Sequence, residues 1–445
     1  MVLLQGKFLS SAVLAALSEQ YRRYGVVAIV AMATTCTGVA YGQAPVIRAS
    51  QFNANLRQHF GTEADRANQH LATVIPTAYG YKYSESEADA DSSCPDCASS
   101  SNGCDGGCDS MGGGDDPWKL FPNSFLGFNI GGWNSVGYHT YDNGGNFNSH
   151  SDRVNLHQAW LYAERVADGS KGFGLGGRID YVYGVDAQDT QAFGRDDGHW
   201  DNGWDNGIYG HAIPQLYGEV AMGDLSVKIG KFFTIIGYEV VGATGNFFYS
   251  QSYTMYNSEP FTHTGVLSSY KMSDDVTVFN GWVQGWDSGF RDNGDAYLGG
   301  TSLQLTENTN FTSSVVVGRF GRGPSDESGY MVSNILTTQL SDKLNYVLWI
   351  DVLDTDRTGR AVERKTFDLN QYFLYTVSDN IVWGNRLEWY NVDRGVFGAT
   401  SSNDIYAYTT GFNYRMGKNM LLRPELRWDW DKGGIVGNER GRSQT

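Results

Sequence analysis

The chain has few prolines, no excess of positive charge and no long apolar run. It contains 9 prolines in 445 residues and carries a formal net charge of −16. No stretch approaches the roughly 18 apolar residues of a membrane-spanning helix, and an acidic chain is a poor partner for nucleic acid. Glycine (56 residues) and aromatic side chains (14%) are abundant instead. Many short strands, tight turns and aromatic bands at membrane surfaces use these residues.

Residues 420–430 alternate between two kinds of side chain. From Leu422 to Trp430 the even positions are apolar or ring-bearing, and the odd positions are charged: Arg423, Glu425, Arg427 and Asp429. Because successive side chains of a strand point to opposite faces, this strand has one face for hydrocarbon and one for water. The alternation recurs at 173–184, 344–353, 381–392 and 403–416. It places further charged residues on the polar faces: Arg178, Asp180, Arg386 and Glu388.

Fifteen strands can be followed from Ser124 onward. We expect them near 125–138, 153–166, 173–184, 213–223, 225–233, 264–272, 276–286, 296–305, 309–320, 329–340, 344–353, 366–378, 380–392, 404–416 and 419–430. Short turns and longer polar connections alternate between them, as in outer-membrane barrels. The sequence therefore predicts an all-β fold, a transmembrane antiparallel up-and-down β-barrel of about 16 strands. The last strand is apparently missing, because residues 437–445 do not show a strand pattern.

The first 120 residues differ from the rest. Arg22-Arg23, an apolar run at Val26–Ala33 and small residues near Gly42 and Ala44 predict a signal peptide or leader over residues 1–44. Residues 45–120 form a periplasmic segment of low complexity, rich in Cys, Gly, Ser and Asp, before the barrel of residues 121–445. Its four cysteines resemble a zinc or iron–sulfur ligand set, but an oxidising compartment favours disulfides. The candidates are Cys94, Cys97, Cys104 and Cys108.

The connection Thr234–His263 is long yet rich in apolar and aromatic residues. A solvated loop would not carry so many, so we expect it to fold into the barrel and narrow the channel. It carries three titratable residues: Glu239, Glu259 and His263. Acids on this loop facing arginines on the wall would set up a transverse field that filters small polar solutes. Alternatively, these charges pair with one another and hold the loop in place.

Several stretches resemble a known family. Residues 230–240, 246–250 and 259–265, together with Gly176–Tyr181 and Leu422–Arg427, are similar to the OmpL-like β-barrel porins. The similarity runs over about 121–431, and the 230–265 stretch is the most specific part. The resemblance implies an outer-membrane pore and supplies no agreed functional residues. The Cys-rich segment lies outside it, and a closing strand is absent.

Two other groups of residues could support metal binding or catalysis. Asp197, Asp201 and Asp205 recur every four residues in a Gly-containing loop and could bind Ca²⁺. Their spacing does not match the standard twelve-residue calcium loop, which favours an acidic external loop. Pairs of acids, Glu239 with Glu259 or Asp180 with Glu219, could serve a glycosidase, with Trp282 and Trp286 stacking on sugars. Lumen strands routinely carry such acids, so we expect no enzyme and no cofactor.

The sequence thus favours a channel of the bacterial outer membrane for passive diffusion of ions or small polar solutes, narrowed by 234–263. The alternatives are a plugged or structural outer-membrane barrel, and a soluble secreted sugar-binding β-protein. The expected partners are outer-membrane lipid and the solutes, with no nucleic acid. A homotrimer is expected by analogy with porins.

Overall fold

The computed structural model describes residues 125–140, 147–192, 200–290, 294–321, 327–357, 363–394, 402–417, 419–431 and 442–444. The expected leader (1–44), the Cys-rich segment (45–120) and Asp197 lie outside these ranges, so those expectations stay predictions.

The described residues form one large antiparallel sheet with short helices in its connections. Its strands are β1 (Asn129–Tyr138), β2 (Val154–Arg165), β3 (Gly174–Gly184), β4 (Asp205–Asn206), β5 (Tyr209–Met222), β6 (Leu225–Phe233), β7 (Thr262–Ser273), β8 (Val276–Val283), β9 (Asp295–Thr306), β10 (Thr309–Arg319), β11 (Glu327–Ser341), β12 (Leu344–Arg357), β13 (Lys365–Ser378), β14 (Ile381–Arg394), β15 (Asn403–Met416), β16 (Met420–Leu422), β17 (Glu425–Asp431) and β18 (Arg442–Gln444). The helices are α3 (Asp186–Thr190), α4 (Tyr253–Ser258) and the 3₁₀ turn η2 (Ala243–Gly245). Among the described residues, no helix is long and apolar enough to cross a membrane.

Consecutive strands pair from β1–β2 to β17–β18, except that β3 and β4 both pair with β5, and β16 and β17 both pair with β15. Counting β16 and β17 as one strand and leaving out the two-residue β4 gives sixteen. All fifteen predicted strands are confirmed, as is the alternation of short and long connections. The expectation that residues 437–445 hold no strand was wrong, because Arg442–Gln444 pair with Arg427–Asp429 of β17. A polar tripeptide shows no alternation long enough to detect, and the free edge of β17 supplies its partner.

Pro424 explains why the predicted strand 419–430 appears as β16 and β17. Proline has no backbone N–H, so the hydrogen-bond ladder to β15 is interrupted at this position. The pairing register is nevertheless the same on both sides, with Tyr414 opposite Leu422 and Gly411 opposite Glu425. The carbonyl of Pro424 still accepts from the amide of Phe412, at 3.0 Å.

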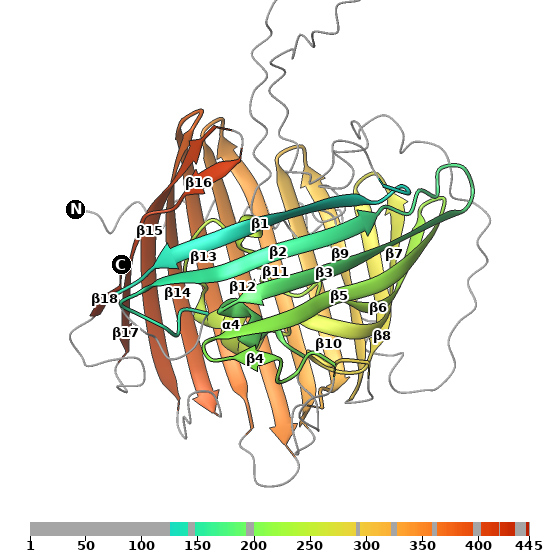
Figure 1. Ribbon diagram of the computed structural model, residues 1–445, viewed down its shortest axis with the longest axis horizontal. Helices are drawn as coiled ribbons and strands as arrows, with labels where there is room; N and C mark the ends of the chain where they lie inside the picture. Colours follow the sequence, from blue (N-terminus) through green and yellow to red (C-terminus); the bar gives the residue numbers. More distant parts are fainter. Residues whose placement is uncertain are drawn as a thin grey trace, which may run out of the picture. The chain divides into compact units, whose positions relative to one another are not determined.

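The two faces of the sheet differ as the alternation predicts. On β3, Ile179 keeps 42% of its surface exposed, while Arg178 and Asp180 on either side keep 4% and 0%. On β14, Trp383, Leu387 and Trp389 are exposed on the outer face, whereas Arg386 and Glu388 are buried. A sheet with an apolar outer face and a polar inner face is typical of a transmembrane barrel. Figure 1 shows the sheet curling so that β1–β6 pass in front of β10–β15, with α4 drawn between them.

Candidate functional site

The connection between β6 and β7, residues 234–261, is held at its base by two side chains. The hydroxyl of Thr234 lies 3.0 Å from Nε2 of His263, whose Nδ1 lies 2.8 Å from the carbonyl of Gly285. Since a carbonyl only accepts, Nδ1 carries the proton and Nε2 accepts from Thr234. The Asp287 carboxylate accepts from the amides of Phe261 and Thr262, both at 2.8 Å. His263 is therefore an anchor of the base. We call residues 234–261 the inward segment.

Glu239 joins the inward segment to β13 and β14. Its Oε1 accepts from Arg386 Nη1 at 2.5 Å and from the Tyr372 hydroxyl at 2.9 Å, and its Oε2 accepts from the amide of Ser252 at 2.7 Å. Arg386 also donates to the carbonyl of Ser250, at 2.9 Å. The Arg386 side chain is 0% exposed, so the pair is removed from solvent. Charge-assisted hydrogen bonds of this kind are short and strong.

Two wall carboxylates accept from backbone amides of the segment. Glu388 Oε1 accepts from both the amide and the hydroxyl of Thr254, each at 2.9 Å. Glu425 accepts from the amides of Tyr249 and Ser250, at 2.7 and 3.1 Å. Thr254 lies in α4, whose N-terminus is capped by the Ser252 side chain. The wall acids thus bind amide groups that a short helix and a turn leave unpaired.

Two wall arginines donate to carbonyls of the segment. Arg423 Nη1 donates to the carbonyl of Ala243 at 2.6 Å. Arg427 Nη1 donates to the carbonyl of Gln251 at 2.5 Å, while its Nε donates to Asp429 at 2.8 Å. The predicted inward residues of β14 and of 423–427 are therefore brought together with Glu239. In this structure they bind the segment through hydrogen bonds and an ion pair, and a part in solute selection stays a prediction.

The segment is also attached to β2, by residues that the alternation did not single out. Gln158 Nε2 donates to the carbonyl of Val241 at 2.7 Å, and its Oε1 accepts from the amide of Ala243 at 2.9 Å. The Tyr249 hydroxyl lies 2.5 Å from His157 Nε2, and His157 Nδ1 lies 2.8 Å from Asp186. A register shift opposite Ser135 leaves His157 unpaired, so that neighbouring residues 157 and 158 are both buried. Such a bulge re-aims a side chain and cannot be read from a period of two.

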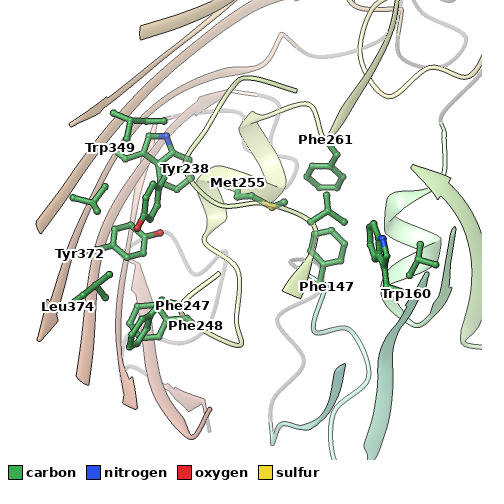
Figure 2. Close-up of a cluster of buried hydrophobic side chains, with 14 of the residues drawn as sticks. Phe147, Trp160, Tyr238, Phe247, Phe248, Met255, Phe261, Trp349, Tyr372 and Leu374 are labelled. Atoms are coloured by element: carbon green, nitrogen blue, oxygen red, sulfur yellow. The ribbon is translucent and has the colours of Figure 1, made fainter. Parts of the chain in front are cut away.

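An apolar cluster extends from β12 and β13 to β2 through the inward segment. Figure 2 shows Trp349, Tyr372 and Leu374 on one side and Trp160 on the other. Tyr238, Phe247 and Phe248 lie next to the first group, and Met255, Phe147 and Phe261 lie between that group and Trp160. These side chains are buried. The expectation that the aromatic residues of 234–263 would pack on the inner wall matches this arrangement.

Glu259 lies apart from the arginines, in a buried group of acids. Burial raises the pKa of its carboxyl well above the ordinary value, and the charge of Asp351 and a hydrogen bond to it add to the shift. The charges of Glu239 and Asp368 act in the same direction. Asp351 lies in β12, Asp368 in β13 and Glu239 in the segment itself. Glu259 therefore tends to stay protonated above the pH at which a solvated glutamate ionises.

Arg178 and Asp180 are not part of this contact. Arg178 Nε lies 2.9 Å from Asp180 Oδ1, and its Nη1 lies 3.2 Å from Glu164 Oε2, all on β2 and β3. Three of the four acids considered for a glycosidase are bound by neighbouring side chains. Asp180 is bound by Arg178, Glu219 accepts from the Ser226 hydroxyl, and Glu239 is bound by Arg386.

Two of the three candidate calcium ligands, Asp201 and Asp205, lie in the described part of the chain. Asp201 is buried and accepts from the amides of Ala192 and Ile213, at 2.8 and 2.7 Å. Asp205 accepts from the Gln191 side chain, at 2.8 Å. In the part of the chain that is described, no group of three acidic, histidine or cysteine side chains is arranged to hold a metal ion. Asp197 lies outside that part, so calcium binding stays a prediction.

Solved outer-membrane proteins resemble the fold at low sequence identity. A loop L8 deletion mutant of OmpT from Vibrio cholerae matches with a TM-score of 0.49 and 10% identity, over 72% of this chain and 97% of that one. OmpF of Salmonella typhi in complex with daunomycin matches with a TM-score of 0.46 and 11% identity, over 72% and 96%. The outer membrane channel DcaP of Acinetobacter baumannii matches with a TM-score of 0.43 and 11% identity, over 74% and 97%. No curated protein matches the chain.

A family model accounts for most of the sequence. The family described as "Putative beta-barrel porin-2, OmpL-like" matches residues 127–445, which include every described strand. The match confirms the resemblance seen in residues 230–265 and extends it to the end of the chain. The protein therefore belongs to this family of bacterial outer-membrane β-barrel porins.

Proposed function

We propose that the protein is a passive diffusion channel for ions or small polar solutes, and that the inward segment narrows its lumen. The attachment of the segment to two separate parts of the wall supports this role. Gln158 of β2 binds it from one side, and Arg386 and Glu388 of β14 bind it from the other. A segment held at both sides lies across the interior, so the opening beside it sets the size of solute that passes.

One observation favours a second candidate, a barrel that is plugged. The cluster around Met255 and Phe247 reaches from β12–β13 to β2, and its members are buried (Figure 2). Arg386 and Arg427 keep 0% and 1% of their surfaces exposed. Lumen arginines that face a wide aqueous path would be hydrated. By analogy with porins we also propose that the protein is a homotrimer. Sedimentation of the purified protein in detergent would test this oligomeric state.

Planar-bilayer recording separates the two candidates. We expect the purified protein to form channels, and replacement of Val240–Gln251 by a short Gly/Ser linker to raise the single-channel conductance several-fold. Heat-modifiable gel migration shows that each variant has folded. Conductance in the shortened variant alone indicates a plugged barrel, and conductance in neither contradicts the channel. Equal conductance in both would show that the segment does not narrow the path.

Charge selectivity is the second part of the proposal. The segment carries Glu239 and Glu259, and the wall beside it carries Arg386, Arg423 and Arg427. Burial favours the protonated form of Glu259, so the charge comes from Glu239. The variant Glu239→Gln, alone or together with Glu259→Gln, should shift the reversal potential in a salt gradient towards the equilibrium potential of the anion. An unchanged reversal potential with unchanged conductance would leave these acids with the anchoring role only.

We predict that acid stabilises the inward position of the segment. An acid whose pKa is raised in the docked state binds its proton more tightly there. Docking is thus most favourable below the ordinary pKa of 4.5 of Glu259, and weakens as the pH rises towards the raised value. Asp189, which accepts from the Tyr256 hydroxyl at 2.7 Å and whose pKa burial raises to about 6, acts in the same direction.

Cleavage of the segment by chymotrypsin in detergent micelles measures this effect. We expect cleavage to be faster at about pH 8 than at about pH 6, after correction for the activity of the protease itself. Glu259→Gln resembles the protonated acid and should reduce the difference. A difference of the same size in that variant would assign the pH dependence to other groups.

A further inference from the structure

The inner wall formed by β1, β2, β3, β5 and β6 carries aromatic and charged side chains that do not anchor the inward segment through ion pairs. We call this set the wall panel: Trp133, Tyr162, Glu164, Arg178, Glu219 and Lys228. The pairing register places its members side by side. Tyr162 of β2 lies opposite Asp180 of β3, Glu164 lies opposite Arg178, and Glu219 of β5 lies opposite Lys228 of β6.

The aromatic part of the wall panel packs against the edge of the buried apolar cluster and keeps part of its ring surface exposed. Trp133 stacks on Trp160, with ring centroids 4.7 Å apart and an angle of 16° between the planes. The Tyr162 ring follows, 6.5 Å from that of Trp133. Leu161, between Trp160 and Tyr162, is exposed on the outer face, so the two rings point inward. Trp160 is buried, but Trp133 and Tyr162 are only half-buried.

The charged part of the wall panel mixes both signs next to these rings. The Arg178 guanidinium lies 4.5 Å from the centre of the Tyr162 ring and 3.2 Å from Glu164. Its Nη1 is buried and, among the described residues, has no hydrogen-bond acceptor in good geometry. The Lys228 ammonium lies 4.8 Å from the centre of the Tyr217 ring. Donors and acceptors of hydrogen bonds therefore border the same half-open aromatic surface.

We infer that the wall panel is a subsite for a neutral saccharide on its way through the lumen. A sugar ring has an apolar C–H face that can lie on Trp133 or Tyr162, and hydroxyl groups that both donate and accept. The hydroxyls could accept from the Lys228 ammonium, which is half-buried and lies opposite Glu219. This inference rests on the proposed channel function and names a solute class for it.

The mixture of charges argues against an ionic solute. A site for an anion or a cation is stabilised by groups of one sign, whereas here Arg178 and Lys228 stand beside Glu164, Asp180 and Glu219. An aromatic amino acid is the strongest rival, because it has a stacking face and both charges. It would bind the same side chains, so the experiment must include it.

Two measurements on the full-length protein in detergent and in bilayers test the inference. Maltotriose should interrupt the ion current through single channels and bind in calorimetry. Tyr162→Ala and Trp133→Ala should each weaken binding about tenfold, the order expected for loss of a stacked ring. Tyr162→Phe keeps the ring and should stay within a few-fold of the wild type. Trp282→Ala removes a ring that is exposed on the outer face and should change nothing.

The outcomes separate the inference from the proposed function. Channels that conduct KCl but neither bind maltotriose nor are blocked by it overturn the saccharide subsite and leave the channel standing. Tighter binding of tryptophan than of maltotriose would also overturn the saccharide subsite. The same holds if Trp282→Ala weakens maltotriose binding as much as Tyr162→Ala does. Absence of any KCl conductance overturns the channel itself. Trp133 also donates to Gln158, at 2.9 Å. Tyr162→Ala is therefore decisive if Trp133→Ala disturbs the segment.

Discussion

Replacing Arg386 with methionine is expected to release the inward segment from β14. The substitution removes the partner of Glu239 and leaves that carboxylate buried without a compensating charge. Breaking one side of a buried ion pair typically costs about 3–5 kcal/mol. It also removes the donor to the carbonyl of Ser250, at 2.9 Å. The cost should fall on the docking of residues 234–261 rather than on the hydrogen-bond ladders of the sheet, so the barrel should remain folded.

Chymotrypsin reports the release directly. Residues 234–261 contain no lysine or arginine but many tyrosines and phenylalanines, so chymotrypsin can cleave there and trypsin cannot. We expect at least tenfold faster cleavage in Arg386→Met, and a larger or noisier single-channel conductance. The double variant Glu239→Gln/Arg386→Met removes both charges, so its segment should be cleaved more slowly than that of Arg386→Met alone.

An exposed ion pair gives the matched control. Arg319 and Asp295 pair at the rim, with side chains 40% and 54% exposed. Surface pairs are worth about 0–1 kcal/mol, so Arg319→Met should leave cleavage nearly unchanged. If Arg386→Met is cleaved no faster than Arg319→Met, the ion pair with Glu239 does not hold the segment.

The fold could be predicted from the sequence because the membrane imposes a period of two on every strand. Ile179 between Arg178 and Asp180 is one instance, and Leu387 between Arg386 and Glu388 is another. Strand ends were less predictable. β12 continues past Leu353 to Arg357, and Lys365 of β13 binds Asp354 at 2.9 Å. Apolar alternation stops at the membrane surface, whereas backbone pairing does not.

The site was predictable in part. The faces of Arg386, Glu388, Glu425 and Arg427 follow from alternation, and the inward fold of residues 234–261 follows from their apolar content. The partners do not follow, because Glu239 and Arg386 are far apart in sequence and no local rule joins them. Gln158 and His157 were missed because a bulge breaks the period. His263, one of the candidate lumen residues on the loop, forms hydrogen bonds with Thr234 and Gly285 at the base of the segment, and a role in selectivity stays a prediction.

Two glycines of the wall leave room for aromatic rings of the inward segment, and no sequence pattern predicted this role. An added Cβ at Gly384 of β14 would lie 2.1 Å from Cε1 of Phe247, and one at Gly137 of β1 would lie 2.3 Å from Cε2 of Tyr249. In each case the wall residue has no side chain where an aromatic ring of the segment lies. A glycine in a strand usually weakens it, so close approach of another group explains these two positions.

Gly384→Ala is therefore expected to displace the segment although it adds a single methyl group. A well-packed interior accommodates extra atoms at a typical cost of about 1–3 kcal/mol, and here the Phe247 ring must move. We expect chymotrypsin cleavage to rise about tenfold or more, with normal heat-modifiable migration. Gly218→Ala is the control, because an added Cβ there meets nothing within 4 Å.

A double variant tests whether the effect of Gly384→Ala comes from its contact with Phe247. Phe247→Leu alone should weaken docking, since it removes part of a ring packed against Phe248 at 4.9 Å between centroids. The double variant Gly384→Ala/Phe247→Leu should lose less docking free energy than the sum of the two single variants, because the smaller side chain leaves room for the methyl group. Additive losses would mean that Gly384 and Phe247 act independently, and the effect of Gly384→Ala would then not come from this contact.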